Sequence, residues 1–398
     1  MRVLRHPAAT FVAIRAAFLV GTGLALVWAV PSSQAAISSG GYDALSDYLF
    51  GGFAQWDSNW YLSIAEDGYR SESAAFFPLF PALVHVVGAA IGSKMVAGVL
   101  LSLAAAAVGA WAIVEIARPL VGDAAARDSM LLLALYPTAF VFTSVYSEGL
   151  FLAFATTSFL AAQRGRPWLA GVLAALAVAT RLTGLALVPA LVALLWPRSR
   201  AQIPRLAPVI LLPLMAVASV ALLFDQKLGD SLAFVHAQRY WSRDPSWLGP
   251  LSGVYEALAT LPESLDALAS LPARIGTPDD PASVLESLGA QNAQVGLWNV
   301  VDLLVLAGAV ALTVVAYRRL GLAFALFSAA SLAIATSAPG GVLPLHSMVR
   351  FVMVDFPVLI AGATLISDRP QLRTGVLVTL GAVTAVAGVA FGRAIWIA

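Results

Sequence analysis

The stretch "LAGVLAALAVATRLTGLALVPAL" (residues 169–191) is apolar except for a single charged residue, Arg181. A helix that crosses the hydrocarbon core of a bilayer needs about 20 apolar residues, so this stretch is long enough to span it. An arginine near the centre of such a helix costs about 2.5–3.5 kcal/mol on insertion scales, which makes Arg181 a functional candidate by default. The stretch therefore predicts a membrane protein with a polar feature at membrane depth.

The composition of the whole chain agrees with this prediction. Hydrophobic residues make up 60% of the 398 residues and charged residues only 11%, with a mean hydropathy of +0.85. Soluble domains carry about a quarter charged residues, so a soluble fold is excluded. Because lipid offers no hydrogen-bond partners to the backbone, we expect an all-α, polytopic integral membrane protein. The net charge of +1 gives no sign of a nucleic-acid partner, and the absence of cysteine excludes disulfides.

The region around Arg181 has two interpretations. One kinked helix over 168–197 would place the basic "WPRSR" (196–200) outside, whereas two half-length helices would return it to the cytoplasm. Lysine and arginine favour cytoplasmic connections, so the second interpretation is the better one. Arg181 would then lie at the turn between two half-helices, and broken helices are favoured binding sites in membrane proteins.

The other apolar segments complete a topology of about 11 crossings in a single domain, 1–398, plus one partial segment. They lie at the N-terminus to about Val30 and near 77–92, 94–117, 129–145, 147–162, 168–180, 182–197, 206–224, 297–317, 320–338, 350–366 and 374–396. The basic connections expected in the cytoplasm are 163–168, 197–205, 317–319 and 367–373. The loops 31–93 and 225–296 are acidic and are expected to face outward.

Segment 77–92 and the first apolar run differ from the ordinary crossings. Segment 77–92 would reach roughly 24 Å at about 1.5 Å per residue, short of the roughly 30 Å core, so it is expected to be re-entrant or to lie at the surface. The first apolar run follows the basic "MRVLRHP" (1–7), and "PSSQAA" (31–36) offers small residues for signal-peptide cleavage. A retained first helix is favoured because everything downstream is membrane, although cleavage stays open.

The loop 31–93 contains the most unusual polar stretch, "FAQWDSNWYLSIAEDGYRSESAAFFPLFP" (53–81). A helix over about 56–66 would place Trp56, Trp60 and Ile64 on one stripe suited to lying on the bilayer surface. Asp57 then has two interpretations. It is either the N-cap of this helix or a general base that takes a proton from an acceptor hydroxyl. Glu66 and Asp67, at the far end of the helix, are further candidates for substrate binding or the base.

A phosphate group on a substrate would need cations, and arginine grips phosphate oxygens with two parallel hydrogen bonds. The candidates for this role are Arg181, Arg350 with His346 nearby, and Arg239 with Arg243. Each also has a simpler interpretation: Arg181 as a snorkelling side chain, Arg350 as a residue at a helix start beside water, and His346 as a solvated loop residue.

Other polar and aromatic residues, Trp56 and Trp60 among them, are candidates for substrate binding. In "YSE" (146–148), Tyr146 and Glu148 lie in an expected outward turn, where Glu148 either binds sugar or acceptor hydroxyls or is a simple polar turn residue. Phe234, Gln238 and Trp241 repeat at helical spacing, which predicts an amphipathic helix against the site or an aromatic anchor. No metal-ligand spacing, phosphate-binding glycine loop or nucleotide fold is visible, so no cofactor is expected and a divalent cation is the less favoured alternative.

Six blocks in order resemble the bacterial branch of the PIG-V family. They are "QWDSNWYLSIAEDGY" (55–69), "AFFPLFP" (75–81), "LYPTAFVFTSVYSEGLFL" (135–152), residues 169–191, "GDSLAFVHAQRYWSR" (229–243) and "VRFVMVDFP" (349–357). The family contains GPI mannosyltransferase II and belongs to the GT-C class of polyprenyl-phosphate-sugar-dependent glycosyltransferases. The resemblance implies a GT-C-like fold and inverting transfer of mannose from a polyprenyl-phosphate carrier to a lipid, glycan or protein acceptor. It also implies a catalytic carboxylate in the first outward loop, where Asp57 lies.

The predicted function is therefore an outward-facing mannosyltransferase of the bacterial plasma membrane. A transporter or flippase for a lipid-linked substrate is the alternative, because a broken helix, an intramembrane arginine and an outward cavity suit both. A transporter should carry matching interruptions in its two halves. The sequence has one interruption near 181 and no recognisable partner for it in 297–396.

Overall fold

The computed structural model describes residues 6–28, 51–243, 246, 248–269, 291–393 and 395. Within these ranges the chain is helical, and its only β-type pairing is an isolated bridge between Arg243 and Gly340. The sequence 31–36 that could be cleaved, and about a third of each of the two predicted outward loops, lie outside the described residues.

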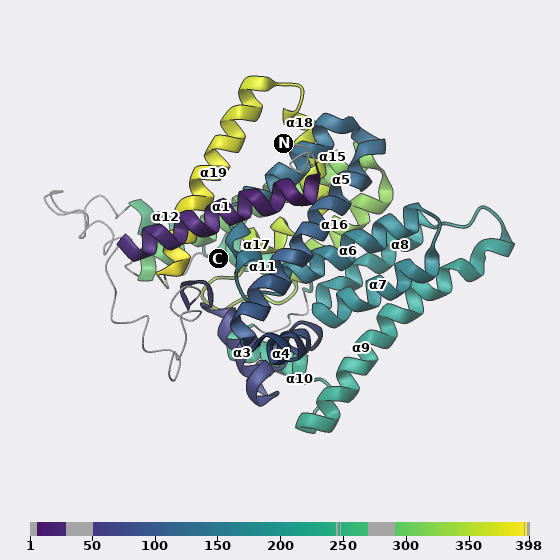
Figure 1. The fold of residues 1–398 in the computed structure, drawn as a ribbon, viewed down its shortest axis with the longest axis horizontal. Coiled ribbons are helices and arrows are strands. Elements are labelled where there is room, and N and C mark those ends of the chain that lie inside the picture. Colours follow the sequence, from purple (N-terminus) through teal and green to yellow (C-terminus); the bar gives the residue numbers. More distant parts are fainter. Residues whose placement is uncertain are drawn as a thin grey trace, which may run out of the picture.

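The helices are shown in Figure 1. Their bounds are α1 Pro7–Trp28, α3 Asp57–Asp67, α4 Leu79–Ile91, α5 Lys94–Ala134, α6 Glu148–Gln163, α7 Pro167–Thr180, α8 Leu187–Leu194, α9 Ala207–Leu228, α10 Ala233–His236, α11 Leu251–Ala259, α12 Leu261–Ala269, α15 Gln291–Leu320, α16 Leu322–Thr336, α17 Met348–Met353, α18 Phe356–Ile366 and α19 Pro370–Gly392. Shorter 3₁₀ turns are η2 Gly51–Phe53, η3 Glu72–Ala75, η4 Ala139–Thr143, η5 Leu182–Ala186, η6 Arg200–Leu206 and η7 Ala237–Trp241.

Five of the described helical segments are long and apolar enough to cross a membrane. They are Pro7–Leu24, Lys94–Ala134, Arg200–Leu228, Gln294–Leu320 and Pro370–Gly392. Five shorter apolar helices, of 10–17 residues, accompany them. The multi-pass, all-α character is therefore confirmed, whereas the predicted number of about 11 crossings stays a prediction.

Several predicted segments have different boundaries in the structure. Segments 94–117 and 129–145 were expected as two crossings, but α5 runs through both and bends at Gly122, whose φ of 82° is not helical. The helix then ends at Ala134, so 129–145 is not one helix. Segment 350–366 is also not continuous, because α17 ends at Met353 and α18 begins at Phe356.

The break at Arg181 is present as predicted. Helix α7 ends at Thr180, Arg181 has extended backbone angles, and the chain continues as η5 and the short helix α8. Segment 77–92 forms the 13-residue helix α4, which at about 1.5 Å per residue is too short to span a bilayer. Its role as a non-spanning segment is consistent with the prediction.

Helix α5 is the centre of the packing, with α1, α4, α6 and α18 against it. Small residues allow α5 and α6 to approach closely: a Cβ on Gly149 would lie 2.4 Å from the carbonyl oxygen of Ser102. Small residues at helix contacts are typical of membrane proteins, where close packing drives association. Since Gly149 follows Glu148, this contact fixes the start of α6 against α5.

Candidate active site

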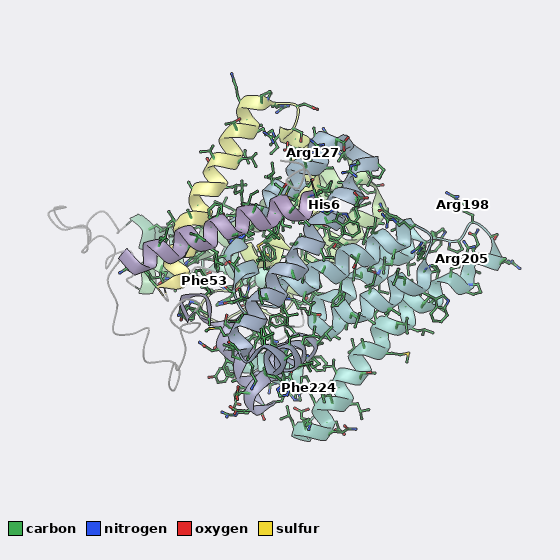
Figure 2. All side chains as sticks on the ribbon, in the orientation of Figure 1. His6, Phe53, Arg127, Arg198, Arg205 and Phe224 are labelled. Atoms are coloured by element: carbon green, nitrogen blue, oxygen red, sulfur yellow. The ribbon has the colours of Figure 1, made fainter. Side chains whose placement is uncertain are left out.

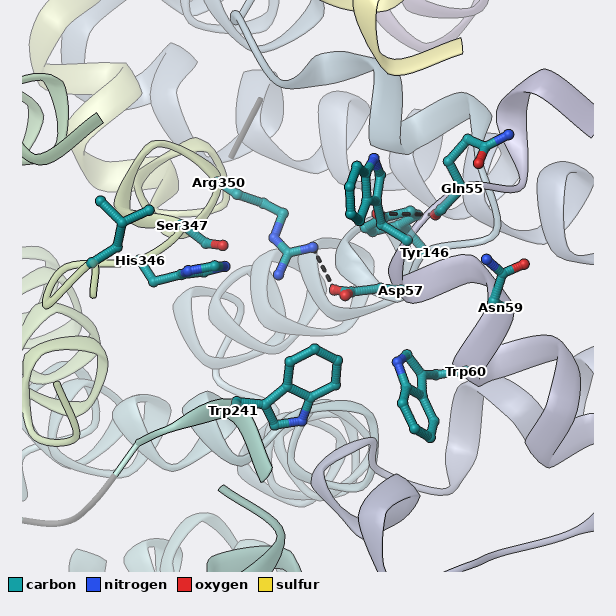
Figure 3. A pocket seen from close by; sticks show the side chains of 11 residues that line it. Gln55, Asp57, Asn59, Trp60, Tyr146, Trp241, His346, Ser347 and Arg350 are labelled. Carbon is teal, nitrogen blue, oxygen red and sulfur yellow. Dashed lines mark hydrogen bonds and ion pairs between the residues drawn. The ribbon is translucent and has the colours of Figure 1, made fainter. Parts of the chain in front are cut away.

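A cavity of about 740 Å³ opens between α3, the start of α17 and the end of η7. Its size falls within the range of about 300–1,000 Å³ typical of small-molecule sites. Figure 3 shows Arg350 and His346 on one side of it and Asp57, Asn59 and Trp60 on the other. Its lining comprises Gln55, Trp56, Asp57, Asn59, Trp60, Tyr146, Trp241, Leu343, His346, Ser347 and Arg350.

Asp57 points into this cavity from the first turn of α3. The N-cap interpretation is wrong, because Trp56 occupies the cap position and no side chain caps this helix. The Asp57 carboxylate instead makes an ion pair with Arg350, with Oδ2 2.5 Å from Nη1. A carboxylate and a guanidinium, contributed by residues 293 positions apart, thus share one pocket.

Arg350 lies in α17 and contacts two carboxylates. In addition to Asp57, its Nε is 3.3 Å from Oε1 of Glu148. Burial by itself would lower the pKa of Arg350, but Asp57 and then Glu148 outweigh it, and the pKa is raised above its usual value. Arg350 is therefore a permanent cation at the cavity wall.

Strained backbone is concentrated around the cavity. Three non-glycine residues have positive φ in the described chain: Trp56 (56°), Ser242 (54°) and Ser347 (68°). Each is next to or part of the lining, beside Asp57, Trp241 and His346 respectively. Such conformations cost about 1–3 kcal/mol each and persist where the surroundings hold them, often at functional sites. The lining side chains are thus aimed by backbone that the rest of the fold constrains.

The tryptophans form an aromatic wall. Trp60 stacks on Phe76 with ring centroids 5.9 Å apart, and Trp241 meets Trp60 edge-on at 5.6 Å. The predicted stripe on the bilayer surface is not what the structure shows, because Ile64 is buried and Trp60 packs within the protein. Trp56 lines the cavity while remaining 41% exposed.

Tyr146 forms the buried floor beneath the ion pair. Its ring centroid lies 5.4 Å from the Arg350 guanidinium carbon, and its hydroxyl donates to the Gln55 carbonyl at 3.3 Å. Burial, followed by the charge of Asp57, raises the pKa of Tyr146 well above its usual value. Tyr146 is thus a neutral hydrogen-bond donor at neutral pH.

Glu148 and Arg181 lie behind the cavity and contact each other. Glu148 was expected in an outward turn, and it is the fully buried first residue of α6. Its Oε1 accepts from Nη1 of Arg181 at 2.7 Å. Neither residue lines the cavity. Nη1 of Arg181 donates to Glu148 and also to the Ser147 hydroxyl, at 3.1 Å, so the donor-phosphate role of Arg181 stays a prediction.

His346 lies on the cavity wall next to Arg243. The Arg243 guanidinium donates to the His346 carbonyl at 3.1 Å. Burial, followed by the charges of Arg243 and Arg350, lowers the pKa of His346 to about 3. His346 is therefore neutral at neutral pH, so it can accept or donate a hydrogen bond but does not add positive charge. Burial, then the charge of Arg350, lowers the pKa of Arg243 to about 10, which still leaves it charged.

The remaining predicted residues lie away from the cavity lining. Glu66 and Asp67 are exposed at the end of α3, where they pair with Lys94 and Arg70. Arg239 is exposed on η7 and is not part of the lining. Gln238 is half-buried, and its side-chain amide donates to the Phe234 carbonyl at 3.5 Å. Of the aromatic helix expected around 234–241, only Trp241 reaches the cavity.

Several residues at the site were not identified from sequence. Asn59 and Gln55 line the cavity, and the acidic residue Asp302 accepts hydrogen bonds from the backbone amides of Met348 and Val349 at the start of α17. Asp302 lies in the apolar segment 297–317, and a charge in such a segment is a signal that could have identified it. Among the described residues, no group of three or more His, Cys, Asp or Glu side chains could hold a metal ion.

Comparison with solved structures finds two chains of low similarity. One is the crystal structure of the Archaeoglobus fulgidus oligosaccharyltransferase in complex with zinc and sulfate, with a TM-score of 0.42 and 14% identity, covering 95% of this chain and 52% of that one. The other is ArnT from Cupriavidus metallidurans bound to undecaprenyl phosphate, with a TM-score of 0.37 and 16% identity, covering 84% of this chain and 72% of that one.

Sequence comparison gives closer matches. GPI alpha-1,6-mannosyltransferase 2 of Mus musculus is 34% identical over 161 residues, covering 37% of this chain and 32% of that protein. The Rattus norvegicus protein of the same name is 36% identical over 163 residues, with the same coverage. The match thus spans about a third of the length of these relatives. The profile of the family described as Mannosyltransferase (PIG-V) matches residues 13–241, more than half of the chain. The chain belongs to the mannosyltransferase (PIG-V) family.

Proposed function

We propose that this protein is a membrane-embedded mannosyltransferase that moves a mannosyl unit from polyprenyl-phosphate-mannose to an acceptor hydroxyl. The observation that carries the proposal is the pairing of Asp57 with Arg350 in a cavity walled by three tryptophans. Membership of the mannosyltransferase family supports the transferred sugar.

The two charged groups suit the two ends of a displacement at the anomeric carbon. The Asp57 carboxylate takes the proton from the acceptor hydroxyl as its oxygen bonds to the anomeric carbon. The bond from that carbon to the phosphate oxygen breaks, and the polyprenyl phosphate departs with the bonding electrons. Arg350 stabilises the negative charge on that leaving group. A single displacement of this kind inverts the anomeric configuration.

The contact between Asp57 and Arg350 must loosen during this cycle. In the structure, Nη1 of Arg350 is on Oδ2 of Asp57 and Nε faces Glu148. A guanidinium has five N–H donors, so a donor phosphate can be bound by the remaining edge or can compete with Asp57 for Nη1. Binding of the donor would then leave the Asp57 carboxylate ready for the acceptor.

The wall of the cavity suits a sugar. Trp56, Trp60 and Trp241 present flat apolar surfaces, and Asn59 and Gln55 add amide groups on the same side. A pocket that is mostly apolar with a few placed polar groups is the usual design for orienting a small ligand. We assign the mannosyl unit to this aromatic wall, beside the Asp57–Arg350 pair.

The distribution of basic residues supports a site on the outer face of a bacterial plasma membrane. In Figure 2, Arg127, Arg198 and Arg205 lie on one side of the molecule, and Phe53 and Phe224 lie on the other. Phe53 is just before the Asp57 helix. Since basic connections favour the cytoplasm, the side that carries α3 and the cavity would face outward.

A transporter is the other function class that the sequence left open. The break between α17 and α18 supplies the second interruption that the sequence did not reveal, and Thr183 and Asp355 from the two breaks line one small cavity. That cavity has a volume of only about 10 Å³, enough for one water molecule at most. A lipid-linked sugar could not be held there, so this geometry favours the enzyme.

The direct test is to incubate purified protein in detergent with polyprenyl-phosphate-mannose and a membrane lipid extract. We expect a mannosylated product by mass spectrometry and polyprenyl phosphate as the second product. Release of free mannose alone, or no consumption of the donor with any acceptor fraction, would contradict the proposed transfer.

A further inference from the structure

A ring of polar contacts lies behind the cavity and joins four parts of the chain. It connects helix α3, the turn into α6, the break after α7 and helix α17. Acidic and basic side chains alternate along it, with Glu148 between two arginines. The ring is completed by one turn of α3, which joins Asp57 to Tyr61. Its members are Asp57, Arg350, Glu148, Arg181, Ser147 and Tyr61.

The contacts follow one another without a gap. Arg350 lies 2.5 Å from Asp57 and 3.3 Å from Glu148, and Glu148 accepts from Arg181 at 2.7 Å. Arg181 also donates to the Ser147 hydroxyl at 3.1 Å.

The ring closes through Tyr61. The hydroxyl groups of Ser147 and Tyr61 are 2.7 Å apart. Tyr61 lies one helical turn after Asp57, on the same helix α3. The base and the cation of the proposed reaction are thus connected twice, once directly and once through the buried residues behind them.

Glu148 is the centre of this ring. Its side chain is 1% exposed, and Oε1 is shared by two guanidinium groups. A buried carboxylate in this position fixes both cations, because removing it would leave two like charges in a region of low dielectric constant. Ser147 and Glu148 are held in turn by the close contact of Gly149 with α5.

We propose that Glu148, supported by Arg181, Ser147 and Tyr61, is a positioning residue that holds Arg350 in place for the donor phosphate. The inference rests on the proposed function in assigning the phosphate to Arg350. Glu148 binds one edge of the Arg350 guanidinium, so that the other edge faces the cavity. Arg181 and Glu148 therefore act on the substrate through Arg350 and do not contact it.

Loss of Glu148 should release Arg350. With Glu148→Gln the Nε edge loses its anionic partner, and the guanidinium is free to turn onto Asp57, its one remaining carboxylate in the ring. Misplacement of a binding group by about 1 Å can cost about 100-fold in rate, so we expect kcat/KM for the donor to fall by about that factor. The KM for the donor should rise, and Glu148→Asp, which keeps the charge, should recover part of the loss.

Two matched controls separate positioning from a general loss of structure. Asp128→Asn breaks another buried carboxylate–arginine pair, with Arg373, which lies outside the ring and the cavity lining. Tyr61→Phe and Tyr69→Phe each remove one tyrosine hydroxyl, but the Tyr69 hydroxyl donates to the Phe76 carbonyl at 2.8 Å and not to the ring. We expect Tyr61→Phe to raise the donor KM several-fold and both controls to leave it unchanged.

The experiment is to determine structures of the wild type and Glu148→Gln by cryo-electron microscopy and to measure donor kinetics for all variants. Arg350 displaced from its wild-type position in Glu148→Gln, together with a raised donor KM, is the expected result. Arg350 unmoved in Glu148→Gln, or a donor KM that changes no more than in Asp128→Asn, would overturn the inference. If the wild type transfers no mannose, the proposed function fails. The position of Arg350 in Glu148→Gln still decides whether Glu148 holds Arg350 in place.

Discussion

Two of the carboxylate–arginine pairs in the described chain, Asp128 with Arg373 and Asp57 with Arg350, look alike in a list of charges but differ in geometry. In the pair between α5 and α19, Nε of Arg373 donates to both oxygens of Asp128, at 2.8 and 2.9 Å. In the pair at the cavity, Arg350 makes one short contact with Asp57 and faces a second carboxylate, Glu148.

The two pairs also differ in whether a cavity and strained backbone lie next to them. Asp57 and Arg350 line a cavity of about 740 Å³ and lie beside two residues with positive φ, Trp56 and Ser347. Asp128 lies inside a regular helix and outside that lining. A buried charge pair is thus not itself a mark of function. Incomplete pairing, an adjacent cavity and strained backbone together distinguish the candidate site from a structural pair.

Asp57→Asn should produce the largest effect, because it removes the carboxylate that distinguishes the cavity pair from the Asp128–Arg373 pair. An amide cannot take a proton from the acceptor, and loss of general-base assistance typically costs about 10²–10⁴ in rate. Turnover with polyprenyl-phosphate-mannose measures this, with thermal unfolding as the control for folding. Turnover within a few-fold of wild type would exclude Asp57 as the base.

Asp128→Asn should show the opposite behaviour. Loss of a charged hydrogen-bonded pair should lower the free energy of unfolding by about 2 kcal/mol, since Arg373 is partly exposed and water can replace its partner. Activity per folded molecule should stay at the wild-type value. Denaturation in detergent and the same transfer assay measure both quantities, and a selective loss of turnover would mean that this pair is also functional.

The pH dependence of stability tests the environment of His346. Its pKa is lowered from 6.5 to about 3 by burial and by the charges of Arg243 and Arg350. His346 in the unfolded chain therefore binds a proton below about pH 6.5, whereas His346 in the folded protein binds one only below about pH 3. Because the unfolded state binds more protons between about pH 6.5 and pH 3, the free energy of unfolding falls as the pH is lowered through this range, by at most about 1.4 kcal/mol per pH unit. Above about pH 6.5 this effect of His346 is absent and the stability is at its full value.

His346→Gln should remove the part of the pH dependence of stability that His346 causes. We expect its stability to fall less steeply than that of the wild type as the pH is lowered from about 6 to about 4. Thermal unfolding as a function of pH measures the difference. Parallel curves for the two proteins would show that His346 is not held neutral by the cavity wall.

Ser347→Gly should give the smallest effect, and its sign is informative. Ser347 has a φ of 68°, and its buried hydroxyl has no hydrogen-bond partner among the described residues. Glycine adopts this conformation without strain, so stability should rise by up to about 1 kcal/mol. Ser337→Gly is the control, because Ser337 has an ordinary φ of −77° and should lose stability. A loss in both variants would mean that the positive φ stores no strain.

Local patterns predicted the parts of the site that depend on one segment. The all-helical membrane fold, the break at Arg181 and the position of Asp57 at the start of a short helix follow from hydropathy and spacing. Asp57, Arg350, His346, Tyr146 and all three predicted tryptophans, Trp56, Trp60 and Trp241, reach the same cavity.

The pairing of charges could not be predicted in this way. Arg181 and Glu148 are 33 positions apart, and Arg350 and Asp57 are 293 apart, so helix packing decides which side chains meet. Hydropathy likewise placed Glu148 in a turn without indicating that Gly149 brings that turn against α5 and buries it. The break between α17 and α18 was missed because the segment is apolar enough to resemble one helix.

The central claim is that Asp57 and Arg350 divide the chemistry, with the carboxylate acting on the acceptor and the guanidinium on the donor phosphate. The most direct measurement is the dissociation constant for polyprenyl phosphate in the wild type, Asp57→Asn and Arg350→Lys. We expect Asp57→Asn to bind at least as tightly as wild type, because Arg350 loses a competing partner. Arg350→Lys loses the planar fork and should bind about 10-fold more weakly or worse. Unchanged binding in Arg350→Lys, or lost binding in a folded Asp57→Asn, would contradict the assignment.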